Sequence, residues 1–239
     1  MIELKNVTKV FGATVAVKNL SLHIPRGELF CFLGPNGAGK TTSIKMLCGL
    51  LRPTAGEVLI AGRPMHKDAV DVRQLMGYIP DTPFLYDRLT PVEFLEFTAD
   101  LYGMPLEQAR GEIELSIEQF GLTGHRSALI KDLSHGLRQR LVYASTFLHK
   151  PEVMLIDEPF IGLDPHSIRM IKELLRAKVQ GGMTILLTTH ILALAEDLAD
   201  RIGIIMKGEI KALGTLEELK KLHALDTGLE DVFLKITEE

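Results

Sequence analysis

The chain has 239 residues, of which 46% are hydrophobic and 24% are charged, as in an ordinary globular protein. Its net charge of −4 excludes a general electrostatic attraction to nucleic acid, so no nucleic-acid partner is expected. The two cysteines, Cys31 and Cys48, form no C-x-x-C pair and indicate buried thiols in a reducing compartment. No secretory signal is visible and no apolar run approaches the roughly 20 residues that cross a bilayer, so any membrane role would need a partner.

The N-terminal residues 1–28 alternate apolar and polar side chains, which predicts antiparallel strands with a turn at Phe11-Gly12. Phe11 would either stack on a base or lie in the core at the end of a strand. Further strands are predicted over 57–61 and 75–80. We therefore assign about 1–28 and 55–80 to one antiparallel β subdomain.

The stretch from residue 29 to residue 51 predicts a strand, a phosphate-binding loop and a helix in succession. Residues 29–33 are all apolar, and apolar residues recur at helical spacing over 44–51. Between them Gly34, Gly39, Lys40 and Thr41 have the G-x-x-x-x-G-K-T spacing of a phosphate loop. Glycines in such a loop let successive backbone N–H groups point at one anion, beside the positive end of the helix.

The polar residues of this loop each have an expected partner. Lys40 would reach the β- and γ-phosphates of a nucleotide, the hydroxyl of Thr41 would bind Mg²⁺, and Thr42 would contact the α-phosphate. The residues predicted to bind the nucleotide here are Gly34, Pro35, Asn36, Gly37, Ala38, Gly39, Lys40, Thr41 and Thr42.

A helical pattern begins at Thr90, where Thr90-Pro91-Val92-Glu93 has the composition of a helix start. The apolar stripe of this helix is predicted to contain Phe94, Leu95, Phe97, Leu101 and Tyr102, with Gly103 after its end. A second helix is predicted over 106–120. With the residues leading to Ser134, these helices predict an α-helical insert over about 84–136.

The second half of the chain alternates strands and helices and ends in a hairpin over 202–213 and two short helices. Together with the phosphate loop, this alternation predicts an α/β fold, and 239 residues suffice for one large domain or two lobes on a shared core. Asp157 and Glu158 follow a predicted buried strand, where ligand chemistry gathers in α/β sheets. Asp157 would serve Mg²⁺ through its water shell, and Glu158 would polarise a water for attack on the γ-phosphate. The simpler interpretation is two acids at an exposed strand end.

The chain resembles, over essentially its full length, the ATP-binding subunit of ATP-binding cassette (ABC) transporters. The segments that carry the resemblance are GPNGAGKTT (Walker A), LSHGL at 133–137 (signature), VMLIDEP (Walker B with the catalytic glutamate), GLD at 162–164 (D-loop) and His190 (switch histidine). The helical insert matches the family's helical subdomain, and Phe11 occupies the place of its base-stacking aromatic. The tail LEDVFLKI is similar to that of exporter-type cassettes.

The resemblance implies a single ABC ATP-binding domain over 1–239, with a P-loop NTPase (RecA-like) α/β core. It also implies an ATPase that uses ATP and Mg²⁺, pairs head to tail with a second ATP-binding subunit, and powers an integral membrane permease. The chain would then lie at the cytoplasmic face of the cell membrane. Glu158 and His190 would be catalytic, whereas Ser134, Gly136 and the D-loop Asp164 would belong to the nucleotide site, with Ser134 and Gly136 contacting ATP held by the other subunit. The metal residues would be Thr41, Asp157 and Asp81. The simpler interpretations are a plain N-cap for Ser134, a backbone-bonded His190 and a turn residue for Asp81.

Three positions depart from the family pattern. Asp81 stands where a glutamine is usual, and His135 and Leu137 stand where glycine and glutamine are usual. The alternatives to a transport subunit are a soluble ABC protein of translation or DNA repair and a small-molecule kinase. The first usually has two cassettes, a coiled coil or zinc cysteines, and the second would not explain LSHGL, GLD and His190 together. The solute, the direction of transport and the choice between homodimer and heterodimer stay open at this point.

Overall fold

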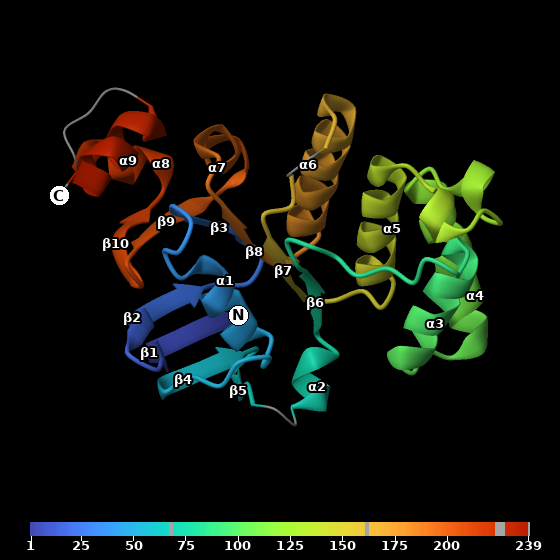
Figure 1. Cartoon of the computed structure of the whole chain (residues 1–239), viewed down its shortest axis with the longest axis horizontal. Helices are drawn as coiled ribbons and strands as arrows, with labels where there is room; N and C mark the ends of the chain where they lie inside the picture. The colour runs from blue at the N-terminus through green and yellow to red at the C-terminus, as the bar shows by residue number, and fades with distance from the viewer. Residues whose placement is uncertain (67–68, 161–162, 223–227, 239) are drawn as a thin grey trace.

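The computed structural model of the chain describes residues 1–66, 69–160, 163–222 and 228–238. These residues form two sheets with helices around them (Figure 1). The smaller sheet has the order β2-β1-β4-β5 and is antiparallel, and the larger has the order β10-β9-β3-β8-β7-β6. The strands are β1 (Ile2–Phe11), β2 (Thr14–Ile24), β3 (Leu29–Leu33), β4 (Ala55–Ile60), β5 (Arg63–Pro64), β6 (Met76–Ile79), β7 (Val153–Asp157), β8 (Thr184–Thr189), β9 (Arg201–Met206) and β10 (Glu209–Gly214).

The helices cover both faces of the larger sheet. They are α1 (Lys40–Leu47), α2 (Val70–Arg73), α3 (Pro91–Leu101), α4 (Leu106–Gln119), α5 (His135–Phe147), α6 (Pro165–Gln180), α7 (Leu192–Leu198), α8 (Leu216–Leu222) and α9 (Leu229–Glu238), with short 3₁₀ turns at Thr123–His125 and Ile130–Asp132. Among the described residues, none of these helices combines the length and the apolar composition needed to span a bilayer.

The central strands divide their side chains between two hydrophobic cores. In β3, Leu29, Cys31 and Leu33 pack on one side with α6, α7 and the helical insert, whereas Phe30 and Phe32 pack on the other side with α1 and the smaller sheet. This division follows from the two-residue period of a strand. Because both faces are covered, the parallel strands are continuous apolar runs, as their sequences predicted.

Strand β6 corrects one sequence assignment. We placed residues 55–80 together in the antiparallel subdomain, but Met76–Ile79 pairs parallel with β7 at the edge of the larger sheet. The physical reason lies in its composition, because Met76, Gly77 and Ile79 are buried and the strand lacks the alternation of a half-exposed antiparallel strand.

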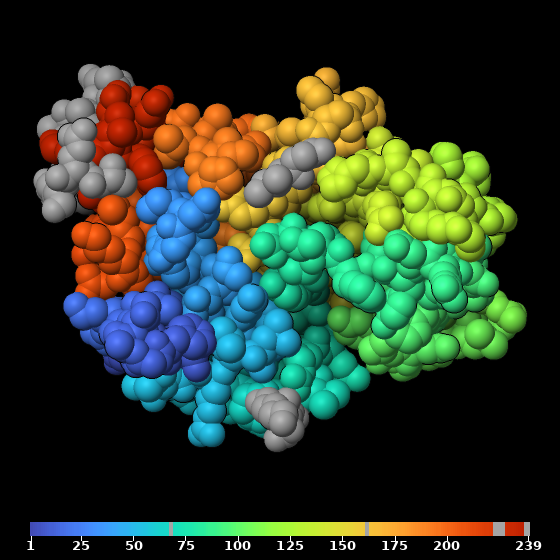
Figure 2. Space-filling view, in the orientation of Figure 1, coloured from blue at the N-terminus to red at the C-terminus, as the bar shows by residue number. Residues whose placement is uncertain are grey.

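The helical insert forms one end of the molecule, seen in green and yellow-green in Figure 2. Helix α3 begins as predicted, since Thr90 and Glu93 form a reciprocal capping box around its first turn. The predicted apolar stripe is wrong in part. Phe94 and Leu95 are buried, but Phe97 and Leu101 are 42% and 65% exposed. Helix α3 therefore has an apolar surface that the core does not use.

Candidate functional site

The phosphate loop joins the end of β3 to the start of α1 and is tightly packed against its surroundings. Gly39 has a φ of 107°, and a Cβ there would lie 2.6 Å from the carbonyl oxygen of Ala16. A Cβ on Gly34 would lie 2.3 Å from the carbonyl oxygen of Ile205. Only glycine fits at these two positions, so the backbone itself forms the loop surface.

The side chain of Lys40 lies inside this loop and is 6% exposed. Its Nζ donates to the carbonyl oxygens of Gly34 at 2.6 Å and of Pro35 at 3.2 Å. The same Nζ lies 3.4 Å from Oε1 of Glu158, whose side chain is 11% exposed. The structure therefore brings together the loop lysine and the second acid of the VMLIDEP segment, which are far apart in the sequence.

Asp157 and Glu158 have different surroundings at the end of β7. Asp157 is fully buried, and its Oδ1 accepts a hydrogen bond from the hydroxyl of Thr188. Its Oδ2 is buried without a hydrogen-bond partner among the described residues. Glu158 has a φ of 48°, a strained conformation for a residue with a side chain, which is common at functional sites.

The carboxylate of Glu158 also faces the histidine predicted as the switch residue. Nδ1 of His190 lies 3.0 Å from Oε2 of Glu158, and the imidazole is 45% exposed. The side chain of His190 thus contacts a carboxylate of the site, which the simpler interpretation of a backbone-bonded histidine does not include. Both carboxylate oxygens of Glu158 are shielded from solvent, and their contacts to Lys40 and His190 lack the angles of good hydrogen bonds, so the group retains lone pairs that can accept a proton.

These residues surround one cavity of about 280 Å³. Its lining contains the predicted residues Pro35, Asn36, Gly37, Ala38, Gly39, Lys40, Thr41, Thr42, Asp81, Glu158 and His190, and also Ala16. The carboxylate of Asp81 accepts a hydrogen bond from the N–H of Thr82 at 2.9 Å, as in a turn. Asp81 is therefore both a turn residue and a lining residue of the cavity. Sequence reasoning missed Ala16 and Thr188, since neither belongs to a local motif.

Residues in and beside the cavity fit Mg²⁺. Thr41 lines the cavity with its hydroxyl, and the buried Asp157, which precedes Glu158 and does not itself line the cavity, has an unpartnered Oδ2. Both are hard oxygen donors of the kind that this ion prefers. Within the described parts of the chain, no group of three or more His, Cys, Asp or Glu side chains could hold a metal alone. An ion would therefore need phosphate oxygens and water to complete its coordination.

The signature residues line a second cavity, of about 370 Å³. Ser134, His135, Gly136, Leu137 and Asp164 are among its lining residues. Ser134 caps α5, because its Oγ accepts from the N–H of Leu137 at 3.4 Å. Asp164 caps α6 in the same way, and its hydrogen bonds from Ser167 lower the pKa of its carboxyl. None of these five residues lines the phosphate-loop cavity.

Phe11 lines neither cavity. Phe11 is 46% exposed at the end of β1, where Nζ of Lys9 lies 5.0 Å from its ring centroid. It is therefore not a core aromatic, and a flat face next to the β1–β2 turn is accessible. Of the predicted GLD segment, Gly162 lies outside the described residues.

The model of the family described as "ABC transporter" matches residues 17–161. The chain belongs to the ABC transporter family. EcsA of Bacillus subtilis, an ABC-type transporter ATP-binding protein, is 34% identical over 240 residues, covering 100% of this chain and 97% of that protein. DrrA of Streptomyces peucetius, a daunorubicin/doxorubicin resistance ATP-binding protein, is 39% identical over 92% of this chain and 66% of its own length. "Probable multidrug ABC transporter ATP-binding protein YbhF" of Escherichia coli is 38% identical over 95% of this chain, which spans only 39% of that relative.

Solved structures of the family agree with this fold. An ATP-binding subunit of an ABC transporter superposes with a TM-score of 0.92 at 33% identity, covering 99% of both chains. A dimeric ATP-binding cassette in a post-hydrolysis state, bound to ADP and phosphate, superposes with a TM-score of 0.81 at 28% identity over 90% of this chain. The predicted α/β P-loop fold and the predicted family are therefore confirmed, and these relatives are transport proteins rather than translation or repair factors.

Proposed function

We propose that this chain is the ATP-hydrolysing motor subunit of an ABC transporter, and that it powers solute movement by a separate membrane permease. The observation that carries the proposal is the convergence of Lys40, Glu158 and His190 on one cavity beside the phosphate loop. Two relatives are named for drug resistance and for export: the daunorubicin/doxorubicin resistance protein DrrA and "Nod factor export ATP-binding protein I" of Cupriavidus metallidurans. These names favour export as the direction of transport.

The residues have distinct roles in the proposed reaction. The loop N–H groups and Lys40 hold the β- and γ-phosphates of ATP, and Glu158 accepts the proton of the attacking water. The oxygen of that water bonds to the γ-phosphorus while the bond to the β-phosphate oxygen breaks, which yields ADP and phosphate. His190, whose Nδ1 lies near the Glu158 carboxylate, donates to the γ-phosphate. Bound Mg²⁺, held through Thr41, Asp157 and Asp81, would supply charge that offsets the phosphates.

A second copy or a related cassette would complete each site. Ser134, Gly136 and Asp164 line a cavity separate from the one around Lys40, so in a head-to-tail pair each ATP would lie between the phosphate loop of one chain and the signature residues of the other. The dimeric neighbour bound to ADP and phosphate supports this arrangement. In that pair Phe11 would lie against the base of the ATP held by its own chain.

Phosphate release from ATP is the direct test of the proposed activity. The purified subunit, or its complex with the co-purifying permease, should release phosphate from ATP in the presence of Mg²⁺ and stop when the metal is removed with EDTA. ATP consumption that transfers phosphate to a small molecule, with no free phosphate, would instead indicate a kinase and overturn the proposal.

A permease needs a surface to engage, and the molecule offers an apolar one beside the helical insert. Phe84 and Tyr86 are 78% and 45% exposed and meet at 5.3 Å between ring centroids, and Tyr86 meets Phe97 of α3 at the same distance. Leu85, which lies between Phe84 and Tyr86 in the sequence, is buried and does not contribute to this surface.

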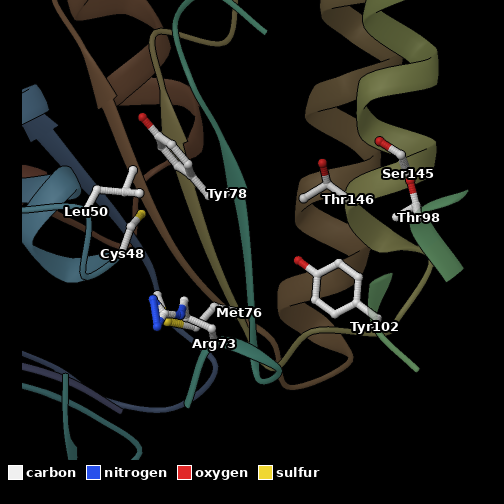
Figure 3. A pocket seen from close by; sticks show the side chains of 9 residues that line it. All are labelled: Cys48, Leu50, Arg73, Met76, Tyr78, Thr98, Tyr102, Ser145 and Thr146. Carbon is white, nitrogen blue, oxygen red and sulfur yellow. The ribbon is translucent and has the colours of Figure 1, made fainter. Parts of the chain in front are cut away.

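A cavity of about 350 Å³ lies between the end of α1, β6 and the helices α3 and α5 (Figure 3). Leu50 and Cys48 line one side, and Tyr102 and Thr98 of the α3 region line the other, with Tyr78 of β6 between them. Phe97 and Leu101 of α3 are also exposed. An exposed apolar surface of this kind is the form of site that accepts an amphipathic helix.

Crosslinking tests this docking surface. We expect a cysteine placed at Tyr86 to crosslink to the permease that co-purifies from native membranes, because Tyr86 is exposed at the centre of the aromatic cluster. The native Cys31 and Cys48 are both buried and do not compete. A cysteine at Leu213, 41% exposed on the far edge strand β10, serves as the matched control. Crosslinks from Leu213 and none from Tyr86 would place the permease elsewhere.

A further inference from the structure

The segment that follows β6 has a direct ionic contact with the signature helix. Asp87 lies one residue after the exposed Tyr86, and its Oδ1 is 2.9 Å from the guanidinium of Arg138 on α5. The two residues are remote in sequence, and both side chains are partly exposed, at 58% and 34%. An ion pair so exposed to solvent contributes little to the free energy of folding. Its significance lies in its position, because it links the segment after β6 to α5.

Arg138 lies one helical turn after the residue that caps α5. Its backbone N–H donates to the carbonyl oxygen of Ser134 at 2.9 Å. A displacement of the Arg138 guanidinium would therefore shift the first turn of α5, which also contains Gly136. It would also change the shape of the signature cavity that Ser134 and Gly136 line.

Two backbone hydrogen bonds attach the same segment to the residues just before Ser134. The N–H of Lys131 donates to the carbonyl oxygen of Asp87 at 3.2 Å, and the N–H of Ile130 donates to that of Leu89 at 2.9 Å. Residues 87–89 are thus hydrogen-bonded to residues 130–131, which precede Ser134, and ion-paired with Arg138, which follows it. The side-chain pair is the part of this connection that a substitution can remove while the backbone bonds remain.

We propose that the Asp87–Arg138 ion pair is a positioning contact that transmits engagement of the permease at the Phe84–Tyr86 surface to Ser134 and Gly136. This inference rests on the proposed function. Neither Asp87 nor Arg138 lines the phosphate-loop cavity. Movement of the docking segment would instead shift α5, and with it the donors offered to the ATP of the opposite chain.

The test uses the complex of the subunit with its co-purified permease and measures steady-state ATP hydrolysis. Asp87→Arg and Arg138→Asp should each lower kcat by roughly three- to tenfold with the KM for ATP unchanged, because the phosphate loop is untouched. The double variant Asp87→Arg/Arg138→Asp should recover at least about half of the wild-type kcat, and Arg138→Lys should retain most of it. The Tyr86 crosslink should persist in all four, since docking itself is intact.

Glu114 and Arg126 provide the matched control. Their ion pair, at 2.7 Å and with 58% and 44% exposure, lies in the same helical insert but does not involve the docking segment or α5. Reversing either charge there should leave kcat unchanged. Single Asp87 and Arg138 variants with wild-type kcat in an active complex, or a double variant as impaired as the singles, would overturn the proposal while the proposed function stands. A wild-type complex without ATP hydrolysis would overturn both.

Discussion

Glu158→Gln is expected to lower ATP turnover by roughly 10²–10⁴ while sparing ATP affinity. The amide keeps the size of the carboxylate but has no oxygen basic enough to accept a proton from water. The phosphate loop and Lys40 still bind the nucleotide, so the variant should accumulate as an ATP-bound dimer that light scattering can detect.

The control for this variant is Glu173→Gln. Glu173 is an exposed α6 residue whose carboxylate pairs with Arg169, one turn away, so its substitution should leave turnover unchanged. Near-normal turnover in Glu158→Gln would remove Glu158 from the role of base, and the buried Asp157 would then be the remaining carboxylate at the end of β7.

Lys40→Ala and Ser134→Arg are each expected to reduce ATP hydrolysis by at least about a hundredfold, for different reasons. Lys40→Ala removes the buried ammonium that would meet the β- and γ-phosphates. Ser134→Arg fills the signature cavity with a long side chain and removes the hydroxyl that caps α5.

The two variants should also differ in ATP binding by the isolated subunit. Lys40→Ala should bind ATP weakly, whereas Ser134→Arg should bind it normally, because Ser134 does not line the phosphate-loop cavity. An arginine at the exposed Thr123 in the helical insert is the matched control for the added bulk and charge. Loss of ATP binding in a folded Ser134→Arg subunit would contradict the separation of the two cavities.

The parts of this site that the sequence could predict were those encoded by local spacing. The phosphate loop and the caps at Ser134 and Thr90 depend on residues within a few positions of one another, and they form as expected. The order of strands and helices in the second half of the chain was also predicted, because apolar runs and helical spacing are local signals.

The parts that could not be predicted depend on contacts between distant segments. The placement of β6 beside β7 was missed because a short apolar run does not reveal its partner strand. The exposure of Phe97 and Leu101 was missed because helical periodicity cannot distinguish a core stripe from an apolar surface kept for a partner. Lys40, Glu158 and His190 lie in three separate segments of the sequence, and their proximity is visible only in the folded chain.

The central claim is that two chains share each ATP site, and mixing the two inactive variants tests it most directly. In a mixed dimer of Lys40→Ala and Ser134→Arg, one site has both Lys40 and Ser134 and the other has neither. If chains pair at random and sites act independently, about half of the dimers are mixed and the mixture should recover about a quarter of the wild-type rate. Mass-tagged subunits would verify that partners exchange. No recovery in a mixture of folded, exchanging variants would contradict independent shared sites.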